Sequence, residues 1–507
     1  MALGAAALPP WLLDREAAEA ASADKAALAE QALSIARKGG ATYADIRINR
    51  YRNESIAARE KQVEQVSRTQ SFGFGVRVLA GGAWGFASSR EVTPESVRRM
   101  TEQALAIARA NARFRKKPIE LIPAKGVKAS WKSAFVRDPF DVPLDGKIQF
   151  LLKMNEAALG VKGVSFVNSS LSFMNEQKFY ASTDGSVIEQ YLIRTAPDLD
   201  VTAIGAARGD FQQRSALPSA KTIGYEYLEQ YPWLQEAEQA GHEAVEKLSA
   251  KSVTPGKYDL VLHPTHLWLT IHESVGHPTE LDRALGWEAD YAGTSFLTPE
   301  KRGKLQFGSK LVNLIADRTQ PQGLATVAYD DEGVPADRWH LVKDGVFVDW
   351  QTTRELAAAT GAAASHGCLH AESWGAVPFA RMANVSLEPA REDVTLDDLI
   401  ADVQEGILIL GNGSYSIDQQ RYNFQFGGQT FWEIKNGKKG AMLRDVAYQS
   451  RTTDFWGALD GLGGEATYEL GGALNDGKGQ PGQSNAVSHG CPVARFRKIN
   501  VLNTAAK

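Results

Sequence analysis

IHESVGHPTELD, residues 271–282, is the stretch of sequence that decides how this chain is organised. Its two histidines, His272 and His277, can bind a divalent metal as neutral imidazoles, and a catalytic zinc typically has three protein ligands and one open position. Glu273 stands beside the first histidine, where a carboxylate can take a proton from metal-bound water, as in the His-Glu-x-x-His motif. The segment is therefore a candidate metal motif, although its spacing is one residue longer.

The longer spacing is a difficulty on a regular helix. Residues four apart lie about 40° apart around the helix axis, whereas residues five apart lie about 140° apart. Gly276 loosens the last turn, and Pro278 disfavours helical angles at His277. We therefore expect a buried helix over Leu267–Val275 that ends there and lets His277 turn back towards His272. On spacing alone, two structural histidines at a Gly-Pro helix stop are the alternative.

Further motifs follow in order along the chain. They are Tyr329-Asp330-Asp331-Glu332-Gly333-Val334-Pro335, Arg381-Met382-Ala383-Asn384, Ser416-Ile417-Asp418, Ile434-Lys435-Asn436-Gly437-Lys438, Gly477-Lys478-Gly479-Gln480-Pro481 and Val487-Ser488-His489-Gly490. Together with residues 271–282, this series resembles the TldD/PmbA family of metalloproteases, on its metal-bearing TldD side. The resemblance is dense from about Lys257 to Thr504 and diffuse before that, and it favours the metal interpretation over the structural one.

The resemblance implies a role for each polar residue of the first motif. His272 and His277 would be metal ligands, and Glu273 would be the general base. Glu280 and Asp282 match acidic positions of the family. Their physical role would be to accept the outer N–H of a ligating imidazole and fix its tautomer. Ordinary surface acids are the alternative for these two carboxylates.

Asp476 is the candidate third ligand, and here the sequence departs from the family pattern. Related proteins commonly carry a cysteine directly before Gly-Lys-Gly-Gln-Pro, residues 477–481 in this chain. A carboxylate can replace a thiolate, since two histidines and one acid bind zinc in other hydrolases. The exchange hardens the site, so zinc is the expected cofactor while iron and manganese stay open. The alternatives are an Asx turn at Asp476 and ligation by Cys491.

The remaining histidines and the cysteines are weaker candidates. His489 could contact substrate or metal, because it lies in a family-like motif near Asp476. Four other histidines are expected to be structural: His263, His266, His366 and His370. The only two cysteines, Cys368 and Cys491, form no disulfide pattern and are expected to be small buried residues.

Composition is that of an ordinary soluble protein, with 43% hydrophobic and 23% charged residues. A net charge of -4 gives no reason to expect nucleic acid or an anionic membrane as a partner. No apolar run approaches the ~20 residues needed for a membrane span. The first residues are apolar without a preceding basic residue, like the rear half of an export signal. We expect an exported, periplasmic protein with a truncated twin-arginine type signal, and a cytoplasmic protein with a free tail is the alternative.

The 507 residues favour two domains. We expect a tail at 1–23, an N-terminal helix and antiparallel-sheet domain at 24–250, and a β-rich C-terminal domain at 251–507 carrying the metal helix, which is an α+β fold. Expected helices cover 24–38, 93–113, 144–159 and 226–249. Hairpin turns are expected at Ala80-Gly81-Gly82, Lys343-Asp344-Gly345, Asn412-Gly413, Asn436-Gly437 and Asn475-Asp476-Gly477.

Two functions of different classes follow. The first is a metal-dependent peptidase that hydrolyses short or unfolded peptides with Glu273 as general base. The second is a non-catalytic relative that binds peptides or helps mature a partner without cleaving, and Asp476 is its chief support. The resemblance also implies an enclosed site and an assembly of two related subunits, so a homodimer or a heterodimer with a related subunit is expected.

Overall fold

Four very long strands form the base of the N-terminal half. The computed structural model describes residues 24–206 and 209–505, so the expected signal remnant at 1–23 lies outside the described residues. The long strands are β1 (Tyr43–Arg59), β2 (Gln62–Ala80), β5 (Val164–Ser182) and β6 (Val187–Ile204). They join β3 (Ala83–Ser89), β4 (Lys128–Lys132) and β7 (Phe211–Ser215) in one sheet, in the order β3-β2-β1-β5-β6-β4 with β7 on β6.

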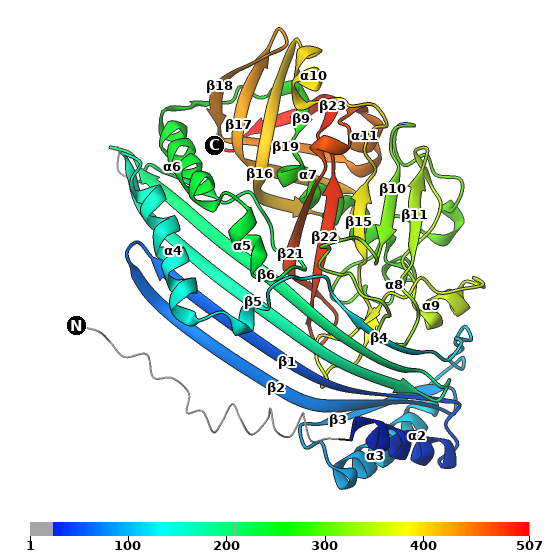
Figure 1. The fold of residues 1–507 in the computed structure, drawn as a ribbon. Helices are drawn as coiled ribbons and strands as arrows, with labels where there is room; N and C mark the ends of the chain where they lie inside the picture. Colours follow the sequence, from blue (N-terminus) through cyan, green and yellow to red (C-terminus); the bar gives the residue numbers. More distant parts are fainter. Residues whose placement is uncertain (1–23, 207–208, 506–507) are drawn as a thin grey trace.

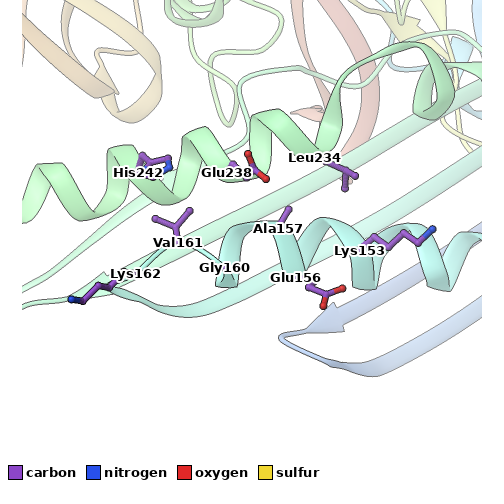
Figure 2. A pocket seen from close by; sticks show the side chains of 9 residues that line it. All are labelled: Lys153, Glu156, Ala157, Gly160, Val161, Lys162, Leu234, Glu238 and His242. Carbon is purple, nitrogen blue, oxygen red and sulfur yellow. The ribbon is translucent and has the colours of Figure 1, made fainter.

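Helices cover the two ends of these strands (Figure 1). At one end, α2 (Lys25–Lys38) and α3 (Pro94–Ala112) pack around Ile46 and Phe74 of the sheet. At the other end, α4 (Leu144–Leu159) and α6 (Trp233–Ser249) pack around Leu171 and Val201. The groove between α4 and α6 carries charges of both signs, from Lys153, Glu156, Lys162 and Glu238 (Figure 2). Mixed charges of this kind are typical of a solvent-exposed surface, so we assign no ligand to this groove.

The C-terminal half contains a closed ring of five strands. In pairing order these are β16 (Glu405–Ile417), β9 (Gly256–Leu262), β23 (Ala494–Asn503), β19 (Val446–Arg451) and β17 (Asn423–Lys435), which pairs with β16 again. β18 (Lys438–Arg444), β8 (Lys251–Ser252) and β20 (Leu459–Leu462) extend this sheet. Many of its apolar side chains belong to one large core that also takes in Leu267, Ile271 and Val275 of the metal segment, and others, such as Leu408 and Trp432, form a separate cluster.

Smaller elements surround the metal segment. A four-stranded sheet has the order β12-β11-β10-β15, and β21 (Glu469–Lys478) pairs with β22 (Gln483–Cys491). The other short strands are β10 (Leu314–Asp317), β11 (Arg338–Lys343), β12 (Val346–Phe347), β13 (Leu369–His370), β14 (Phe379–Ala380) and β15 (Asn384–Leu387). The helices are α5 (Glu226–Gln230), α7 (Pro264–Ile271), α8 (Leu281–Ala284), α9 (Arg354–Ala359), α10 (Leu396–Ala401) and α11 (Thr452–Gly457). Figure 1 places α7 and the β21–β22 hairpin at the centre of the C-terminal half.

The predicted α+β class is confirmed, with a helix and antiparallel-sheet region before a β-rich region. Three local predictions outside the metal segment are wrong. The helix expected over 226–249 is divided into α5 and α6, because Pro232 cannot continue a helix. Asn412-Gly413 and Asn475-Asp476-Gly477 lie inside β16 and β21, where each strand shifts register instead of turning. Within the described residues, the structure contains no helix long and apolar enough to cross a membrane.

Candidate metal centre

A π-helical turn brings the two histidines of the motif together. The sequence predicted that the helix ends at Val275, and this prediction is wrong. The chain continues through the π turn η2 (His272–Gly276) into the 3-10 turn η3 (His277–Thr279). The N–H of His277 donates to the carbonyl of His272, which is the i→i+5 bond of a π turn. The two rings lie 4.5 Å apart between centroids. The wider turn therefore compensates for the additional residue in the spacing.

Gly276 allows this turn to pack tightly against the next layer. A Cβ added at Gly276 would overlap the sulfur of Met382 and lie 2.8 Å from its terminal carbon. Met382 is fully buried. A side chain at this position would therefore force Met382 to shift within the core. The backbone itself does not demand glycine, because its φ is -54°.

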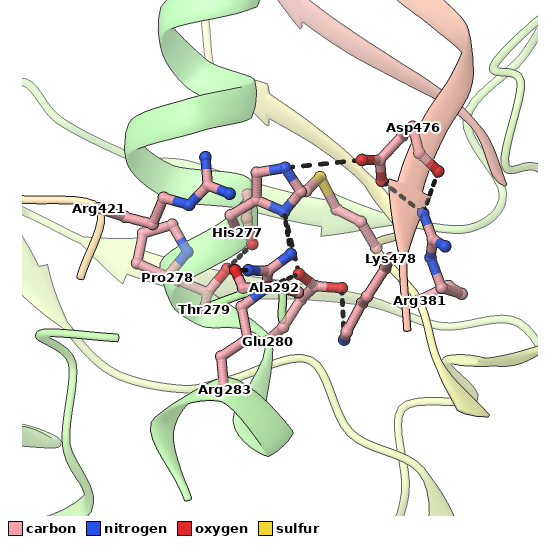
Figure 3. Close-up of polar contacts among 12 residues, drawn as sticks. His277, Pro278, Thr279, Glu280, Arg283, Ala292, Arg381, Arg421, Asp476 and Lys478 are labelled. Carbon is pink, nitrogen blue, oxygen red and sulfur yellow. Dashed lines mark hydrogen bonds and ion pairs between the residues drawn. The ribbon is translucent and has the colours of Figure 1, made fainter. Parts of the chain in front are cut away.

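Asp476 approaches both histidines from the β21–β22 hairpin. Its Oδ1 atom lies 3.6 Å from Nε2 of His272 and 3.6 Å from Nε2 of His277. Its Oδ2 atom accepts a hydrogen bond of 2.8 Å from Arg381 (Figure 3). Burial alone would raise the pKa of Asp476, but the hydrogen bond from His272 and the charge of Arg381 hold that pKa well below its usual range. The carboxylate is therefore ionised, as a metal ligand must be.

The donor set fits a divalent metal ion. His272, His277 and Asp476 each offer one ligand atom, and these atoms all lie within 4.8 Å of one another. Two ligands on a tetrahedral ion with bonds of ~2.0–2.1 Å lie roughly 3.3 Å apart. The 3.6 Å separations to Asp476 are close to this value. Among the described residues, this is the one group of histidine, cysteine and acidic side chains arranged in this way.

His489 orients His272 through a chain of hydrogen bonds. The Nδ1 atom of His489 lies 2.9 Å from the carbonyl oxygen of Val385, so this nitrogen is the donor and Nε2 is left as an acceptor. Nε2 of His489 lies 2.8 Å from Nδ1 of His272, which must then donate. Nε2 of His272 is consequently the nitrogen that faces Asp476. Burial would lower the pKa of His272, but the hydrogen bond to Asp476 and the charge of Asp476 raise it, so a bound metal would take the place of a proton on Nε2. Burial and the neighbouring His272 lower the pKa of His489, which keeps it neutral for this role.

Glu280 plays the corresponding part for His277. Its Oε2 atom lies 3.0 Å from Nδ1 of His277. Arg283 also lies 3.1 Å from that nitrogen, but a guanidinium cannot accept, so Nδ1–H points to the carboxylate. Burial, with Arg283 and Arg421, holds the pKa of His277 well below its ordinary value, so the ring is neutral. Nε2 of His277 is therefore free to bind a metal.

Lys478 ties the acidic residues of the segment to the hairpin. Its ammonium group donates to Glu280 at 2.9 Å (Figure 3). It also donates to the carbonyl of Ala380 at 2.9 Å and lies 2.7 Å from Asp282. Burial alone would raise the pKa of Glu280, but Lys478 and Arg283 hold it well below its usual range. The expected contact between Asp282 and a ligating imidazole is therefore not present. Asp282 contacts Lys478, which in turn contacts Glu280, the partner of His277.

Glu273 is held by an arginine that the sequence did not single out. Its Oε2 atom accepts a hydrogen bond from Nη1 of Arg421, which comes from the turn between β16 and β17. Both side chains are largely buried, with 5% of Glu273 and 16% of Arg421 exposed. Arg381 and Lys478 lie in motifs quoted above, whereas no motif contains Arg421.

The other candidate residues lie in ordinary structural environments. His263 caps α7, and His266 bonds to the Gly411 carbonyl and to Tyr448. His366 contacts Asp337, His370 contacts Asp331, and neither histidine is part of the metal group. Both cysteines are buried, and Cys491 packs in the main core. Asp476 pairs with Asn485 in β21, so it does not form an Asx turn.

The family models and curated proteins that match this chain are described as metallopeptidases or metalloproteases. The PmbA/TldA metallopeptidase domain 1, central domain and C-terminal domain match residues 44–108, 137–251 and 255–503. The chain is 30% identical to a metalloprotease of Methanothermobacter thermautotrophicus, over 91% of this chain and 96% of that protein. It is 22% identical to a zinc metalloprotease TldD homolog of Saccharolobus solfataricus, over 91% and 97% of the two chains.

A solved structure has the same fold. The crystal structure of TldE from Thermococcus kodakarensis superposes with a TM-score of 0.70 and 15% identity, covering 93% of this chain and 99% of that one. This likeness concerns the fold, while the domain matches and the 30% identical relative extend through both halves of the sequence. The chain belongs to the TldD/PmbA family.

Proposed function

We propose that the protein is a metal-dependent peptidase acting on short or unfolded peptides. The observation that carries this proposal is the convergence of Nε2 of His272, Nε2 of His277 and Oδ1 of Asp476, with Glu273 on the same helical segment. When bound there, a divalent ion would supply Lewis-acid polarisation of a carbonyl and of water. The names of the similar proteins, metalloprotease and zinc metalloprotease TldD homolog, support the same reaction.

The proposed chemistry assigns one task to each residue. Glu273 takes a proton from water as the water oxygen attacks the carbonyl carbon, and then passes that proton to the leaving amine. His489 and Glu280 keep the two ligating imidazoles in the tautomer that presents Nε2. Asp476, fixed by Arg381, provides the third ligand. Zinc is the proposed ion. Because a carboxylate replaces the softer thiolate, the site also suits iron and manganese, and elemental analysis of the purified protein distinguishes the three.

A second function has one observation in its favour. Glu273 is already ion-paired with Arg421, so the base is engaged before any substrate arrives. A relative that binds peptides without cleaving them would keep the centre and hold its base in this way. We favour the peptidase because the two histidines and a third acidic donor converge and Glu273 lies on the same helical segment.

One experiment separates the two functions. The purified protein is stripped with a chelator, reloaded with zinc, and given an unfolded fluorescent polypeptide together with a short peptide library. The peptidase predicts cleavage by the reloaded protein and none by the stripped protein. Binding without cleavage by the zinc-loaded protein would support the second function. Light scattering on the same sample tests the further proposal of a dimer, which the similarity to TldE suggests.

A further inference from the structure

The metal centre is electrically balanced by the chain itself. Four buried acids, Glu273, Glu280, Asp282 and Asp476, face four cations, Arg283, Arg381, Arg421 and Lys478. A divalent ion added to this cluster would leave two positive charges in excess in a buried site. Such an excess favours an anionic ligand, because an uncompensated buried charge is costly.

Arg421 is the cation of this cluster that is best placed to meet such a ligand. Its side chain is 16% exposed, whereas those of Arg283, Arg381 and Lys478 are at most 1% exposed. Within the described part of the chain, the guanidinium of Arg421 makes a single hydrogen bond, to Glu273. Its Nε is buried without a partner. Several N–H groups of Arg421 are thus uncommitted beside the proposed base.

The backbone of Arg421 is held in an unfavourable conformation by its surroundings. Its φ is +65°, in the left-handed region that a side chain other than glycine seldom adopts. Asp418 fixes the turn, because its carbonyl accepts from Arg421 N–H at 2.9 Å and its carboxylate accepts from the N–H of Tyr422 at 2.8 Å. Thr452 donates to the carbonyl of Arg421 at 2.8 Å. Strain of this kind clusters at functional sites, but turn residues such as Asp344 and Asn436 share it here, so it adds to the argument only together with the exposure and the uncommitted N–H groups of Arg421.

We propose that Arg421 is a further catalytic residue, which donates a hydrogen bond to the oxygen of the scissile peptide carbonyl as that oxygen becomes negative. This inference rests on the proposed peptidase function. The water oxygen forms a bond to the carbonyl carbon, the π electron pair moves to the carbonyl oxygen beside Arg421, and Glu273 takes the water proton. The pair then returns, the C–N bond breaks, and the proton goes to the amine. Figure 3 shows Arg421 and Asp476 on opposite sides of the His277 ring, so the arginine approaches from the side away from the third ligand.

The test compares a tetrahedral anion with a neutral peptide. A phosphinic peptide blocked at both ends mimics the negative oxygen, and the matching peptide amide mimics the ground state. Calorimetry measures both affinities in the zinc-loaded Glu273→Gln background, which prevents turnover. Arg421→Gln should weaken phosphinate binding by about 10²–10³-fold, the effect of removing one oxyanion donor, and leave the affinity for the amide unchanged. Arg421→Lys should recover part of the loss.

Arg451→Gln is the matched control, because Arg451 lies opposite Asn423 on the neighbouring strand and forms an exposed ion pair with Asp454. It should bind both probes as the parent does. Zinc content and the thermal midpoint are measured for every variant, and normal values show that fold and metal site are intact.

Equal phosphinate affinity in Arg421→Gln and its parent would overturn the proposal. So would an equal loss of affinity for the peptide amide, which would assign Arg421 to general peptide binding. If zinc-loaded wild type neither binds phosphinate nor cleaves any peptide, the peptidase function itself has failed, and the role of Arg421 falls with it.

Discussion

Nδ1 of His272 lies 2.8 Å from Nε2 of His489, although the two residues are separated by 217 positions. The first is on the metal helix and the second is on β22. Since the other nitrogen of His489 donates to Val385, the pair fixes the proton on Nδ1 of His272 and frees Nε2. His489 is therefore a positioning residue for the metal centre.

Replacing His489 by phenylalanine should lower zinc affinity by about 10–100-fold, because the buried Nδ1–H of His272 loses its acceptor. Competition with a chelating dye measures this affinity directly. His242→Phe, on the exposed face of α6, is the control and should not change it. Unchanged zinc affinity in the His489 variant would show that the hydrogen-bond chain does not orient the ligand.

Asp476→Ala should lose bound metal, because catalytic sites seldom function with two protein ligands. Asp476→Cys should restore a sulfur donor, raise zinc affinity relative to manganese and keep activity. Metal per chain, by elemental analysis after dialysis, decides both points. Asp454→Ala, at an exposed aspartate, is the control. Full metal content in Asp476→Ala would place the third ligand elsewhere.

Glu273→Ala should retain metal and lose peptidase activity by about 10²–10⁴-fold, the usual contribution of a general base. Activity and metal content are measured on the same preparation, with the exposed Glu300→Ala as control. If metal is lost with Glu273, the residue is a ligand and the assignment of roles is wrong.

Gly276→Ala should destabilise the protein by about 1–3 kcal/mol, because the new methyl group overlaps Met382 in a packed core. Gly457→Ala is a helical control with open space around the new Cβ, and it should be neutral or slightly stabilising. Urea unfolding of the metal-free proteins measures the difference. Equal stability of the two variants would mean that the π turn moves freely away from Met382.

Buried His266 should make stability depend on pH. Burial lowers its pKa to about 4, below the ordinary value of ~6.5. The unfolded state therefore binds the proton first, so stability is fully present above pH ~6.5 and is lost as pH falls towards ~4, by about 3 kcal/mol. His266→Gln should make the unfolding free energy depend less steeply on pH over this window. The decrease in slope should correspond to about one proton fewer taken up on unfolding. An unchanged slope would contradict the buried neutral histidine.

The sequence was sufficient for elements whose signals are local. The helices expected over 24–38 and 93–113 are present, where Asp24 caps α2 and Thr93 caps α3, and the glycine turn between β2 and β3 is in its predicted place. Asn412-Gly413 failed because a dipeptide suited to a turn also suits a bulge, and only the partner strand decides between them. The division between α5 and α6 could have been predicted from the sequence, because Pro232 lies inside the long helix expected over 226–249.

The candidate site shows the same limit. The spacing of His272 and His277 pointed to a metal motif, but the π turn that makes the spacing work has no local signature of its own. Arg421 reaches Glu273 across 148 positions through a turn built by Asp418. Such a contact depends on how the β16–β17 hairpin is seated over the helix, which periodicity and propensity do not determine.

The central claim is that His272, His277 and Asp476 bind one metal ion. Anomalous diffraction at the zinc edge, from crystals of zinc-loaded protein, tests it most directly. The account predicts one strong peak about 2.0–2.2 Å from Nε2 of His272, Nε2 of His277 and Oδ1 of Asp476. A peak bonded to other residues, or none at this centre under zinc-saturating conditions, would contradict it.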